Sequence, residues 1–311
     1  MTNILVTGGA GFIGSHLATR FVESGHRVRV FDNFSTGKHE NLAHLAGRVE
    51  VMEADLRDAG ACGRACEGME FVFHEAALGS VPKSVEEPQP SHDVNINGTF
   101  NILRAAADCK VRRLIYAGSS SAYGDSEESP KHERLVPCPL SPYAVQKLAG
   151  EHYCSAFSTC FGLETITLRY FNVFGERQDP KSQYAAAIPA FVTAILRGEG
   201  PTIYGDGEQS RDFTYIDNVV EGNVLAMKAA KTRGETVNVA CGGQITVNEV
   251  IAAINRALGA NVKPQHVAPR AGDVRHSCAD IRLANRLLGF RPSIGFEDGL
   301  QRAIDYYRGM A

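Results

Sequence analysis

Residues 3–33 read NILVTGGAGFIGSHLATRFVESGHRVRVFDN, and this stretch decides the fold. The apolar run Asn3–Thr7 predicts a strand buried on both faces, and the helical pattern over Gly11–Ser24 follows it directly. A second apolar run, Val28–Asp32, predicts the next strand. Strand, helix and strand in this order are typical of a parallel sheet with crossover helices.

The turn between the first strand and the helix carries a glycine motif. Gly8, Gly11 and Gly14 are spaced for a tight turn, a close backbone approach to a pyrophosphate and close packing of the helix on the strand. The free N–H groups at the helix start would then face the phosphates. A glycine triplet alone is weak evidence, since an ordinary tight turn gives the same pattern.

Asp32 strengthens the interpretation as a dinucleotide site. It lies 18 residues beyond Gly14, at the end of the second predicted strand. A carboxylate there accepts hydrogen bonds from the adenosine ribose hydroxyls, and it would repel a 2′-phosphate, so the sequence favours NAD over NADP. The alternative is that Asp32 is an ordinary turn residue at a strand end.

The alternation continues and then changes character after Tyr170. Further strands are predicted at Val49–Glu53, Phe71–Glu75, Arg112–Gly118 and Glu164–Tyr170, and helices at Leu56–Cys66, His92–Ala107 and Pro142–Phe161. From about Asn172 onward the sequence predicts a second, mixed lobe, which is able to return a strand to the main sheet. Thr246 and Glu249 predict a capping box at the start of one of its helices.

A tyrosine and a lysine begin the helix predicted after the fifth strand. In LSPYAVQKLAGEHY, Ser141 suits the N-cap and Pro142 the first helical position, so Tyr143 and Lys147 share one face. A tyrosine titrates near 10, so a phenolate near neutrality costs ~4 kcal/mol. The Lys147 ammonium, the helix N-terminus and an oxidised nicotinamide would offset that cost together.

The Tyr-x-x-x-Lys pattern is weak by itself. With ten tyrosines in the chain, an exposed Tyr–Lys pair on a helix is the ordinary explanation. Its position argues otherwise, because Ser119, 24 residues before Tyr143, stands in the serine cluster that ends the fifth predicted strand. Ligands bind at the carboxyl ends of strands in such sheets, so we expect the two segments to converge there.

Composition excludes several classes of function. The 311 residues carry a net charge of −3 without a basic stripe, which argues against a nucleic-acid partner. The most apolar stretch, Ala185–Leu196, is too short to cross a bilayer. A strand that begins by Asn3 leaves no room for a signal peptide, so we expect a cytoplasmic protein with its eight scattered cysteines as free thiols, mostly buried. No His or Cys falls at ligand spacing, so we expect no metal site.

GGAGFIG, the serine-rich strand end and YAVQK together resemble the extended short-chain dehydrogenase/reductases that act on nucleotide sugars. The resemblance covers essentially the whole chain and continues through LRYFNVFG, GDGEQSRDFTYIDNV, NVACGG and PRAGDVRHSCAD. Within that group the chain is similar to NAD-dependent 4-epimerases, above all those of UDP-N-acetylglucosamine, on AALGSVPKS, LRYFNVFGERQDP and GDVRHSCAD.

The resemblance implies an α/β fold with a Rossmann-type doubly wound parallel sheet and a smaller mixed α/β substrate-binding lobe. The dinucleotide-binding domain would span residues 1–171, with strands and helices returning from the C-terminal half, and the UDP-sugar-binding lobe residues 172–311. It also implies a homodimer through the helices at His92–Ala107 and Pro142–Phe161, although ordinary core packing would explain both helices equally.

The resemblance assigns roles residue by residue. The catalytic residues would be Ser119, Tyr143 and Lys147. The NAD-binding residues would be Gly8, Gly11, Phe12, Ile13, Gly14, Asp32, Asn33, Ser35, Thr36, Gly37, Asp55, Leu56, Ala76, Ala77, Asn95, Tyr143, Lys147 and Tyr170. The UDP-sugar would be held by Ser120, Ser121, Tyr143, Asn172, Ala187, Tyr204, Arg211, Arg270, Asp273 and Ser277. Without the resemblance, each arginine in that set would count as a solvated surface charge.

Two departures from related enzymes narrow the reaction. Nucleotide-sugar 4,6-dehydratases carry an acidic pair where this chain has Ser120 and Ser121, and the UDP-glucuronate decarboxylases carry a Glu near that strand end that is missing here. Epimerases restricted to non-acetylated sugars have a bulky aromatic residue where Ser277 leaves room for a 2-acetamido group.

The implied reaction is therefore C4 epimerisation. Tyr143 takes the O4 proton while the C4 hydride passes to NAD, the 4-keto sugar turns, and the hydride returns to its other face. UDP-GlcNAc and UDP-GalNAc come first as substrates. UDP-Glc with UDP-Gal, and UDP-glucuronate with UDP-galacturonate, stay open, as do a nucleotide-sugar oxidoreductase with net turnover of NAD and a catalytically silent NAD-binding scaffold.

Overall fold

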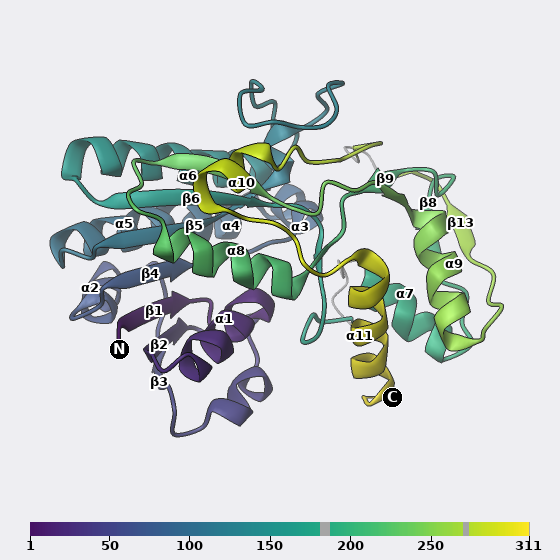
Figure 1. Ribbon diagram of the computed structural model, residues 1–311, viewed down its shortest axis with the longest axis horizontal. Helices are drawn as coiled ribbons and strands as arrows, with labels where there is room; N and C mark the ends of the chain where they lie inside the picture. Colours follow the sequence, from purple (N-terminus) through teal and green to yellow (C-terminus); the bar gives the residue numbers. More distant parts are fainter. Residues whose placement is uncertain (181–186, 270–273, 311) are drawn as a thin grey trace.

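Seven parallel strands form one sheet across the larger part of the molecule (Figure 1). The computed structural model describes residues 1–180, 187–269 and 274–310. Across the sheet the strand order is β3-β2-β1-β4-β5-β6-β11. Their bounds are Asn3–Thr7 (β1), Arg27–Asp32 (β2), Glu50–Glu53 (β3), Phe71–His74 (β4), Arg113–Ser119 (β5), Glu164–Tyr170 (β6) and Glu235–Val239 (β11). This order confirms the expected Rossmann-type doubly wound sheet, in which ligands bind beyond the carboxyl ends of the strands.

The central strand β1 is buried on both faces, as its continuous apolar run predicts. Ile4 and Val6 belong to the hydrophobic core on one face of the sheet, and Leu5 belongs to the core on the other. The first core is covered by α1 (Phe12–Glu23) and α8 (Ile216–Lys228). The second is covered by α2 (Ala59–Cys66), α5 (Thr99–Asp108) and α6 (Pro142–Phe161).

A smaller lobe of mixed structure lies beside the sheet, at the right of Figure 1. Its elements are α7 (Ala187–Leu196), β8 (Thr202–Tyr204), β9 (Ser210–Arg211), β12 (Ile245–Thr246), α9 (Val247–Leu258), β13 (Gln265–Val267) and α11 (Phe296–Arg308). The predicted capping box at Thr246 and Glu249 is confirmed at the start of α9. The C-terminal half also returns α8, β11 and α10 (Arg282–Leu288) to the main sheet, where β11 pairs in parallel with β6.

The remaining elements are short and lie in the chain between the strands and helices named above. They are η1 (His39–Leu45), α3 (Val81–Glu86), α4 (Pro88–His92), η2 (Asp93–Gly98), η3 (Ser120–Tyr123), β7 (Val173–Phe174) and β10 (Thr214–Tyr215). The helix expected over His92–Ala107 is confirmed as continuous helical structure, but its first part, η2, is wound as a π-helix between α4 and α5. The helix expected from Leu56 begins only at Ala59, because the Asp58 carboxylate caps it by accepting the N–H of Ala61.

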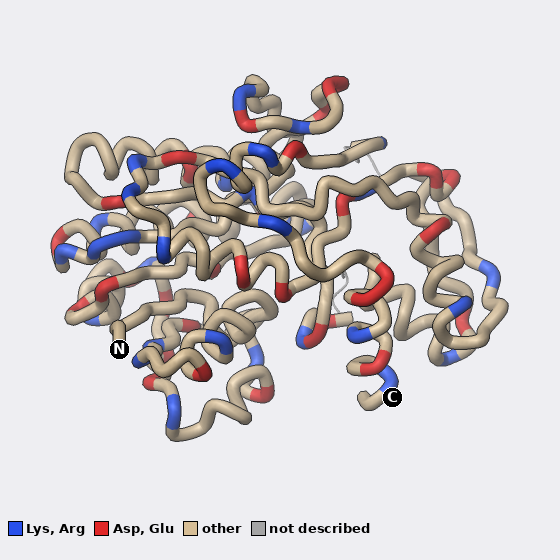
Figure 2. The backbone as a smooth tube through the Cα atoms, in the orientation of Figure 1, with Lys and Arg blue, Asp and Glu red and all other residues tan. Residues whose placement is uncertain are grey.

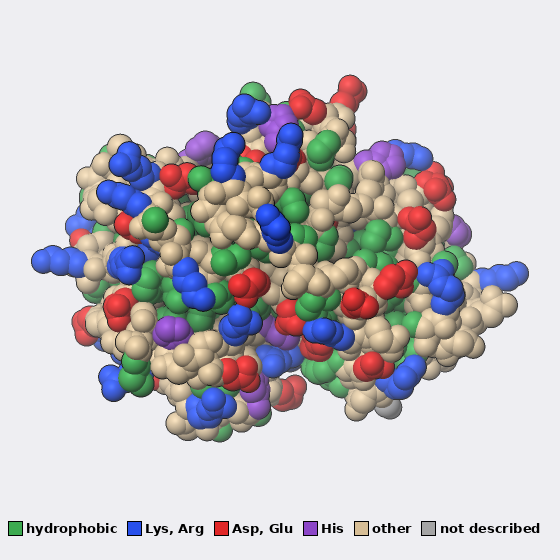
Figure 3. All heavy atoms as spheres, viewed as in Figure 1, with side chains coloured by type: hydrophobic (Ala, Val, Ile, Leu, Met, Phe, Trp, Pro, Cys, Tyr) green, Lys and Arg blue, Asp and Glu red, His purple; other side chains and the backbone are tan. Residues whose placement is uncertain are grey.

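The surface mixes both signs of charge. Figure 2 shows Lys and Arg alternating with Asp and Glu along the described backbone, and the face in Figure 3 scatters them among apolar side chains. Among the described helices, none combines the length and the apolar character that a bilayer crossing requires. All eight cysteines are free thiols as predicted, but the expectation that most are buried is wrong, since only Cys62, Cys66 and Cys154 are.

Candidate functional site

The glycine turn after β1 is packed so closely that side chains do not fit. Gly8 has φ +65°, and a Cβ there would lie 2.7 Å from the Ala76 backbone. A Cβ on Gly14 would lie 2.2 Å from the carbonyl oxygen of Gly8, so helix α1 rests directly on the turn. Gly11 is the N-cap of α1 and offers no side-chain cap, which leaves the first N–H groups of the helix available to a ligand.

We predict that Gly14→Ala destabilises the protein by about 1–3 kcal/mol, because the added methyl group forces the turn and the helix apart. The matched control is Gly63→Ala on α2, where an added Cβ meets nothing within 4 Å. That change should stabilise the protein by about 0.5–1 kcal/mol, since Ala loses less backbone entropy in a helix. Denaturant unfolding of both variants measures the difference, and equal stabilities would contradict the packing argument.

The carboxylate of Asp32 sits at the end of β2 beside this turn. One oxygen accepts the N–H of Ala10 at 2.9 Å and the other accepts the N–H of Phe34 at 2.8 Å. Burial raises the pKa of Asp32, and these backbone hydrogen bonds lower it. Gly37 packs behind this carboxylate, because a Cβ there would lie 3.0 Å from an Asp32 oxygen.

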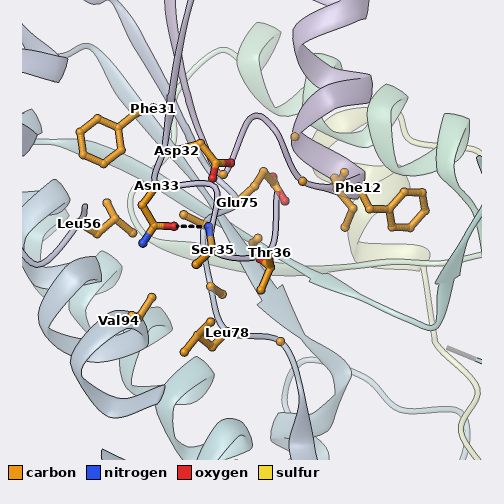
Figure 4. A pocket seen from close by; sticks show the side chains of 18 of the residues that line it. Phe12, Phe31, Asp32, Asn33, Ser35, Thr36, Leu56, Glu75, Leu78 and Val94 are labelled. Atoms are coloured by element: carbon orange, nitrogen blue, oxygen red, sulfur yellow. Dashed lines mark hydrogen bonds between the residues drawn. The ribbon is translucent and has the colours of Figure 1, made fainter. Parts of the chain in front are cut away.

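A cavity of about 300 Å³ opens at the carboxyl ends of the strands (Figure 4). It brings together most of the residues expected to bind a dinucleotide: Gly8, Gly11, Phe12, Ile13, Gly14, Asp32, Asn33, Ser35, Thr36, Asp55, Leu56, Ala76, Ala77, Tyr143, Lys147 and Tyr170. Gly37 and Asn95 are not among its lining residues. Asn95 instead positions the lining residue Leu78, because its side chain accepts the N–H of Leu78 and donates to the carbonyl of Leu78.

Both ends of the cavity are polar, and the wall between them is apolar. In Figure 4, Leu78 and Val94 lie below Ser35 and Thr36, and Leu56 lies beside Asn33. The Asn33 amide donates to Asp55 at 2.8 Å. The adjacent Arg57 guanidinium, with two hydrogen bonds to Asp55, holds the pKa of that carboxyl well below its usual range.

The other end of the cavity holds the start of α6. Ser141 caps this helix by accepting the N–H of Ala144, as predicted, and the N–H of Tyr143 is held by the Ser84 hydroxyl at 3.1 Å. Ser119 ends β5 and shares a 2.8 Å hydrogen bond with the hydroxyl of Ser121. The Ser119 side chain also hydrogen-bonds Tyr143, so the two segments converge, as their order in the chain predicts.

The environments of Tyr143 and Lys147 differ. Burial raises the pKa of Tyr143, and a hydrogen bond with the Ser119 side chain lowers it. The Lys147 ammonium donates to the carbonyl of Ala117 at 2.8 Å and lies 5.0 Å from the ring centre of Tyr116. Burial lowers the pKa of Lys147. That Lys147 itself lowers the pKa of Tyr143 stays a prediction.

Glu75 is a residue of this site that the sequence analysis did not find. It follows β4 directly, lines the cavity, and accepts a 2.9 Å hydrogen bond from the hydroxyl of Tyr170. The signal was available, because a carboxylate directly after a fully buried apolar strand must lie at the ligand-binding edge of the sheet. The other lining residues that were missed are Phe31, Ala54, Leu78, Gly79, Val94, Ala117 and Gly118.

A second cavity, of about 590 Å³, lies in the smaller lobe. Of the residues expected to hold a UDP-sugar, it brings together Asn172, Ala187, Tyr204 and Arg211. Asn172 begins the crossing from the sheet to this lobe with φ +32°, outside the usual range of a non-glycine residue. Sequence reasoning missed further lining residues, among them Phe174, Phe191, Thr202, Gln209 and Phe213.

Among the described candidate residues, the lining of neither cavity includes Ser119, Ser120, Ser121 or Ser277. Ser120 and Ser121 form the short helix η3 directly after β5. Ser277 donates its N–H to the carbonyl of Ser210, next to Arg211, so it stands at the edge of the second cavity. Arg270 and Asp273 lie outside the described residues.

Comparison with known proteins supplies a family and several relatives. The sequence profile of the NAD dependent epimerase/dehydratase family matches residues 4–240. A UDP-glucose 4-epimerase of Mycolicibacterium smegmatis is 36% identical over 308 residues, which cover 98% of both chains.

Two solved structures are similar along their whole length. The UDP-glucose 4-epimerase of Thermotoga maritima with UDP-glucose has a TM-score of 0.95, 38% identity and 99% coverage of both chains. The UDP-N-acetylglucosamine 4-epimerase of Methanobrevibacter ruminantium in complex with UDP-N-acetylmuramic acid has the same score and identity, and covers 100% of this chain and 99% of that one.

Proposed function

The chain belongs to the NAD dependent epimerase/dehydratase family, and from that premise we propose that it inverts carbon 4 of a UDP-hexose, with UDP-GlcNAc and UDP-GalNAc as its preferred pair. The relatives confirm the family expected from the sequence, and their activities support an NAD-dependent isomerase of UDP-sugars. The finer choice of the acetylated pair rests on Ser277. The observation that carries the proposal is that Tyr143 and Lys147 line one end of the dinucleotide cavity and that the Ser119 side chain hydrogen-bonds Tyr143.

The cavity fits NAD. The absence of a Cβ at Gly8 and Gly14 lets the turn pack against Ala76 and against α1. The first N–H groups of α1 have no side-chain cap and are available to a pyrophosphate. Asp32 would accept the adenosine ribose hydroxyls and Lys147 would hold the nicotinamide ribose, with Tyr170 against the ring. When bound, NAD supplies the oxidation of carbon 4 and the reduction that follows it.

The residues of the chain supply the proton transfer. Tyr143 would take the proton from the sugar O4 and later return it, while Ser119 hydrogen-bonds the same oxygen. Because burial raises the pKa of Tyr143, the phenolate depends on positive charge nearby, and the buried Lys147 ammonium is the residue suited to supply it. No net redox change occurs, so the same NAD serves successive turnovers.

Inversion requires that the nucleotide stays bound while the keto sugar turns. Arg211, with its planar guanidinium, would hold the diphosphate from the second cavity, and Asn172 would reach it from the crossing segment. Arg270 and Asp273 are proposed to assist at the diphosphate and the uridine ribose. At the sugar end, Ser120 and Ser121 lie beside Ser119. Their small side chains would contact the sugar ring only loosely.

The purified protein is incubated with each UDP-sugar to test this function. Inversion is followed by proton NMR of the hydrogen on carbon 4 of the sugar. The proposal expects UDP-GlcNAc and UDP-GalNAc to interconvert with no consumption of added NAD or NADH. Faster inversion of UDP-Glc or UDP-glucuronate would correct the preferred substrate. Stoichiometric consumption of the coenzyme would instead identify a net oxidoreductase, and no reaction with any UDP-sugar would favour a silent scaffold.

Ser277 gives the prediction on substrate choice. Ser277→Tyr should lower kcat/KM for UDP-GlcNAc by about 100-fold, because the ring fills the space for the acetamido group. The rate with UDP-glucose should change little, so the ratio of the two substrates is the measurement. Equal losses for both sugars would contradict the role of Ser277 as the gate for the acetyl group.

We also propose that the protein is a homodimer through α5 and α6. Phe100, Tyr153 and Phe161 expose large aromatic surfaces on these helices, 43%, 37% and 54% of each residue. A pair of such helices buries them against the same helices of a second copy. Phe161→Glu is predicted to shift sedimentation from dimer to monomer, whereas Met310→Glu, at an exposed position outside these helices, should not. A wild-type monomer would contradict this.

A further inference from the structure

Glu75 is an acidic residue in the dinucleotide cavity for which the proton transfer described above has no use. It is one of three acidic residues among the described lining residues, and the other two, Asp32 and Asp55, belong to the adenosine end. Glu75 instead joins the group formed by Tyr143, Lys147 and Tyr170 through its hydrogen bond with Tyr170. A carboxyl group there needs a separate explanation.

A chain of hydrogen bonds fixes where this carboxyl group points. The Asn223 amide donates to the Tyr170 oxygen at 2.8 Å, and the Tyr170 hydroxyl donates to Glu75 at 2.9 Å. Because the single Tyr170 proton is directed at Glu75, the network demands an acceptor there, and both oxygens of a carboxylate are acceptors. Asn223 and Tyr170 are themselves buried, so the network is held rigidly.

Two side chains from different elements act on Glu75, and one of them, Lys147, is charged. Burial raises the pKa of Glu75 to about 7, while the Tyr170 hydrogen bond from β6 and the Lys147 ammonium from α6 lower it. Glu75 acts on Lys147 in turn: burial lowers the pKa of Lys147, and the negative charge of Glu75 raises it. The ammonium remains anchored on the Ala117 carbonyl instead of closing an ion pair with Glu75. The carboxylate is therefore available to a further cation.

We propose that the Glu75 carboxylate makes the site bind the oxidised nicotinamide dinucleotide more tightly than the reduced one. This rests on the proposed function, which puts the nicotinamide against Tyr170 and Lys147. The oxidised ring is a cation and the reduced ring is neutral, so a carboxylate in a cavity of low dielectric constant stabilises only the former. The preference suits an enzyme that must regain its oxidised coenzyme after every turnover.

The test is a competition between the two forms of the coenzyme. Protein is dialysed to equilibrium at pH 8 against equal concentrations of NAD⁺ and NADH and then denatured, and the released coenzymes are quantified by chromatography. Glu75→Gln, which keeps an acceptor for Tyr170 but removes the charge, should lower the bound NAD⁺ to NADH ratio about tenfold, or ~1.4 kcal/mol. Glu75→Ala, which also removes the charge, should lower it to a similar degree.

Two further variants separate charge from structure. Asp55→Asn makes the same chemical change at the adenosine end, so it should weaken both coenzymes equally and leave the ratio unchanged. Glu75→Asp retains a charge but is too short for the Tyr170 bond, and it should keep most of the wild-type ratio. A ratio in Glu75→Gln within about twofold of the wild type, or a loss in Glu75→Asp as large as in Glu75→Gln, overturns the inference.

The outcomes also distinguish this inference from the proposed function. If the wild-type protein retains neither coenzyme, the proposed function fails and the inference fails with it. If the wild-type protein retains both coenzymes and inverts UDP-sugars, but the bound NAD⁺ to NADH ratio does not depend on the charge of Glu75, only the inference fails.

Discussion

Tyr143→Phe is expected to lower the rate of C4 inversion by about 10²–10⁴-fold, the range for loss of a positioned acid–base group. The phenyl ring keeps the packing at the start of α6, but it offers no oxygen to take the O4 proton. The backbone N–H of Tyr143 keeps its hydrogen bond with Ser84, so the helix start is unchanged. The measurement is the initial rate of UDP-GalNAc formation, together with the amount of NAD bound.

Tyr153→Phe is the matched control for this variant. Tyr153 lies on the same helix but is partly exposed, and the substitution removes the same oxygen atom. Its rate should equal that of the wild type. Bound NAD should be similar in both variants, because Tyr143→Phe keeps the ring that lines the dinucleotide cavity. A Tyr143→Phe protein with the wild-type rate would contradict the assignment of Tyr143 as the base.

Arg169→Met is expected to destabilise the protein by about 3–5 kcal/mol, the cost of breaking a buried ion pair. The Arg169 side chain, 4% exposed, makes three hydrogen bonds with the carboxylate of Glu151, whose side chain is also 4% exposed. Its guanidinium also lies 4.5 Å from the ring centre of Tyr123. Removal of the cation leaves the Glu151 charge buried without its partner, and denaturant unfolding measures the loss.

Two comparisons test the cause of that loss. The double variant Arg169→Met/Glu151→Leu should recover most of the stability, because two apolar side chains need no partner. Arg20→Met breaks the exposed pair of Arg20 and Glu221 and should cost less than about 1 kcal/mol. If the double variant is no more stable than Arg169→Met, the loss comes from packing and not from the unpaired charge.

Local signals explain why some elements were predicted to the residue. The strand Asn3–Thr7 and the helix Pro142–Phe161 have the predicted bounds. The helix is delimited at its start by the Ser141 cap and at its end by Gly162, which adopts the left-handed conformation. Both signals lie within one turn of the boundary they set, so the sequence alone reveals them.

Other features depend on contacts between distant parts of the chain. The π-helical segment within the helix expected over His92–Ala107 contains Asn95, which hydrogen-bonds Leu78 and Gln146. The pairing of β11 with β6 joins residues about seventy positions apart. Neither arrangement has a signature in the local pattern of apolar residues, so periodicity could not predict them.

The two cavities of the candidate site also differ in how well local sequence signals predict their residues. The residues of the dinucleotide cavity follow strand ends, which the sequence marks clearly, and most of the expected ones line it. The second cavity is lined by one face of α7, by residues 172–174 and 199–213, and by Val247 of α9, and no local pattern in the sequence shows that these segments meet. Its expected residues therefore came from the resemblance, and its aromatic wall of Phe174, Phe191 and Phe213 was not foreseen.

The most direct test of the whole account follows a single atom. UDP-GlcNAc carrying deuterium on carbon 4 is incubated with the protein in ordinary water, and the product is examined by NMR and mass spectrometry. We predict UDP-GalNAc that still carries the deuterium on carbon 4, because the enzyme removes it and returns it to the opposite face. Deuterium lost to the solvent, or no UDP-GalNAc at all, would contradict it.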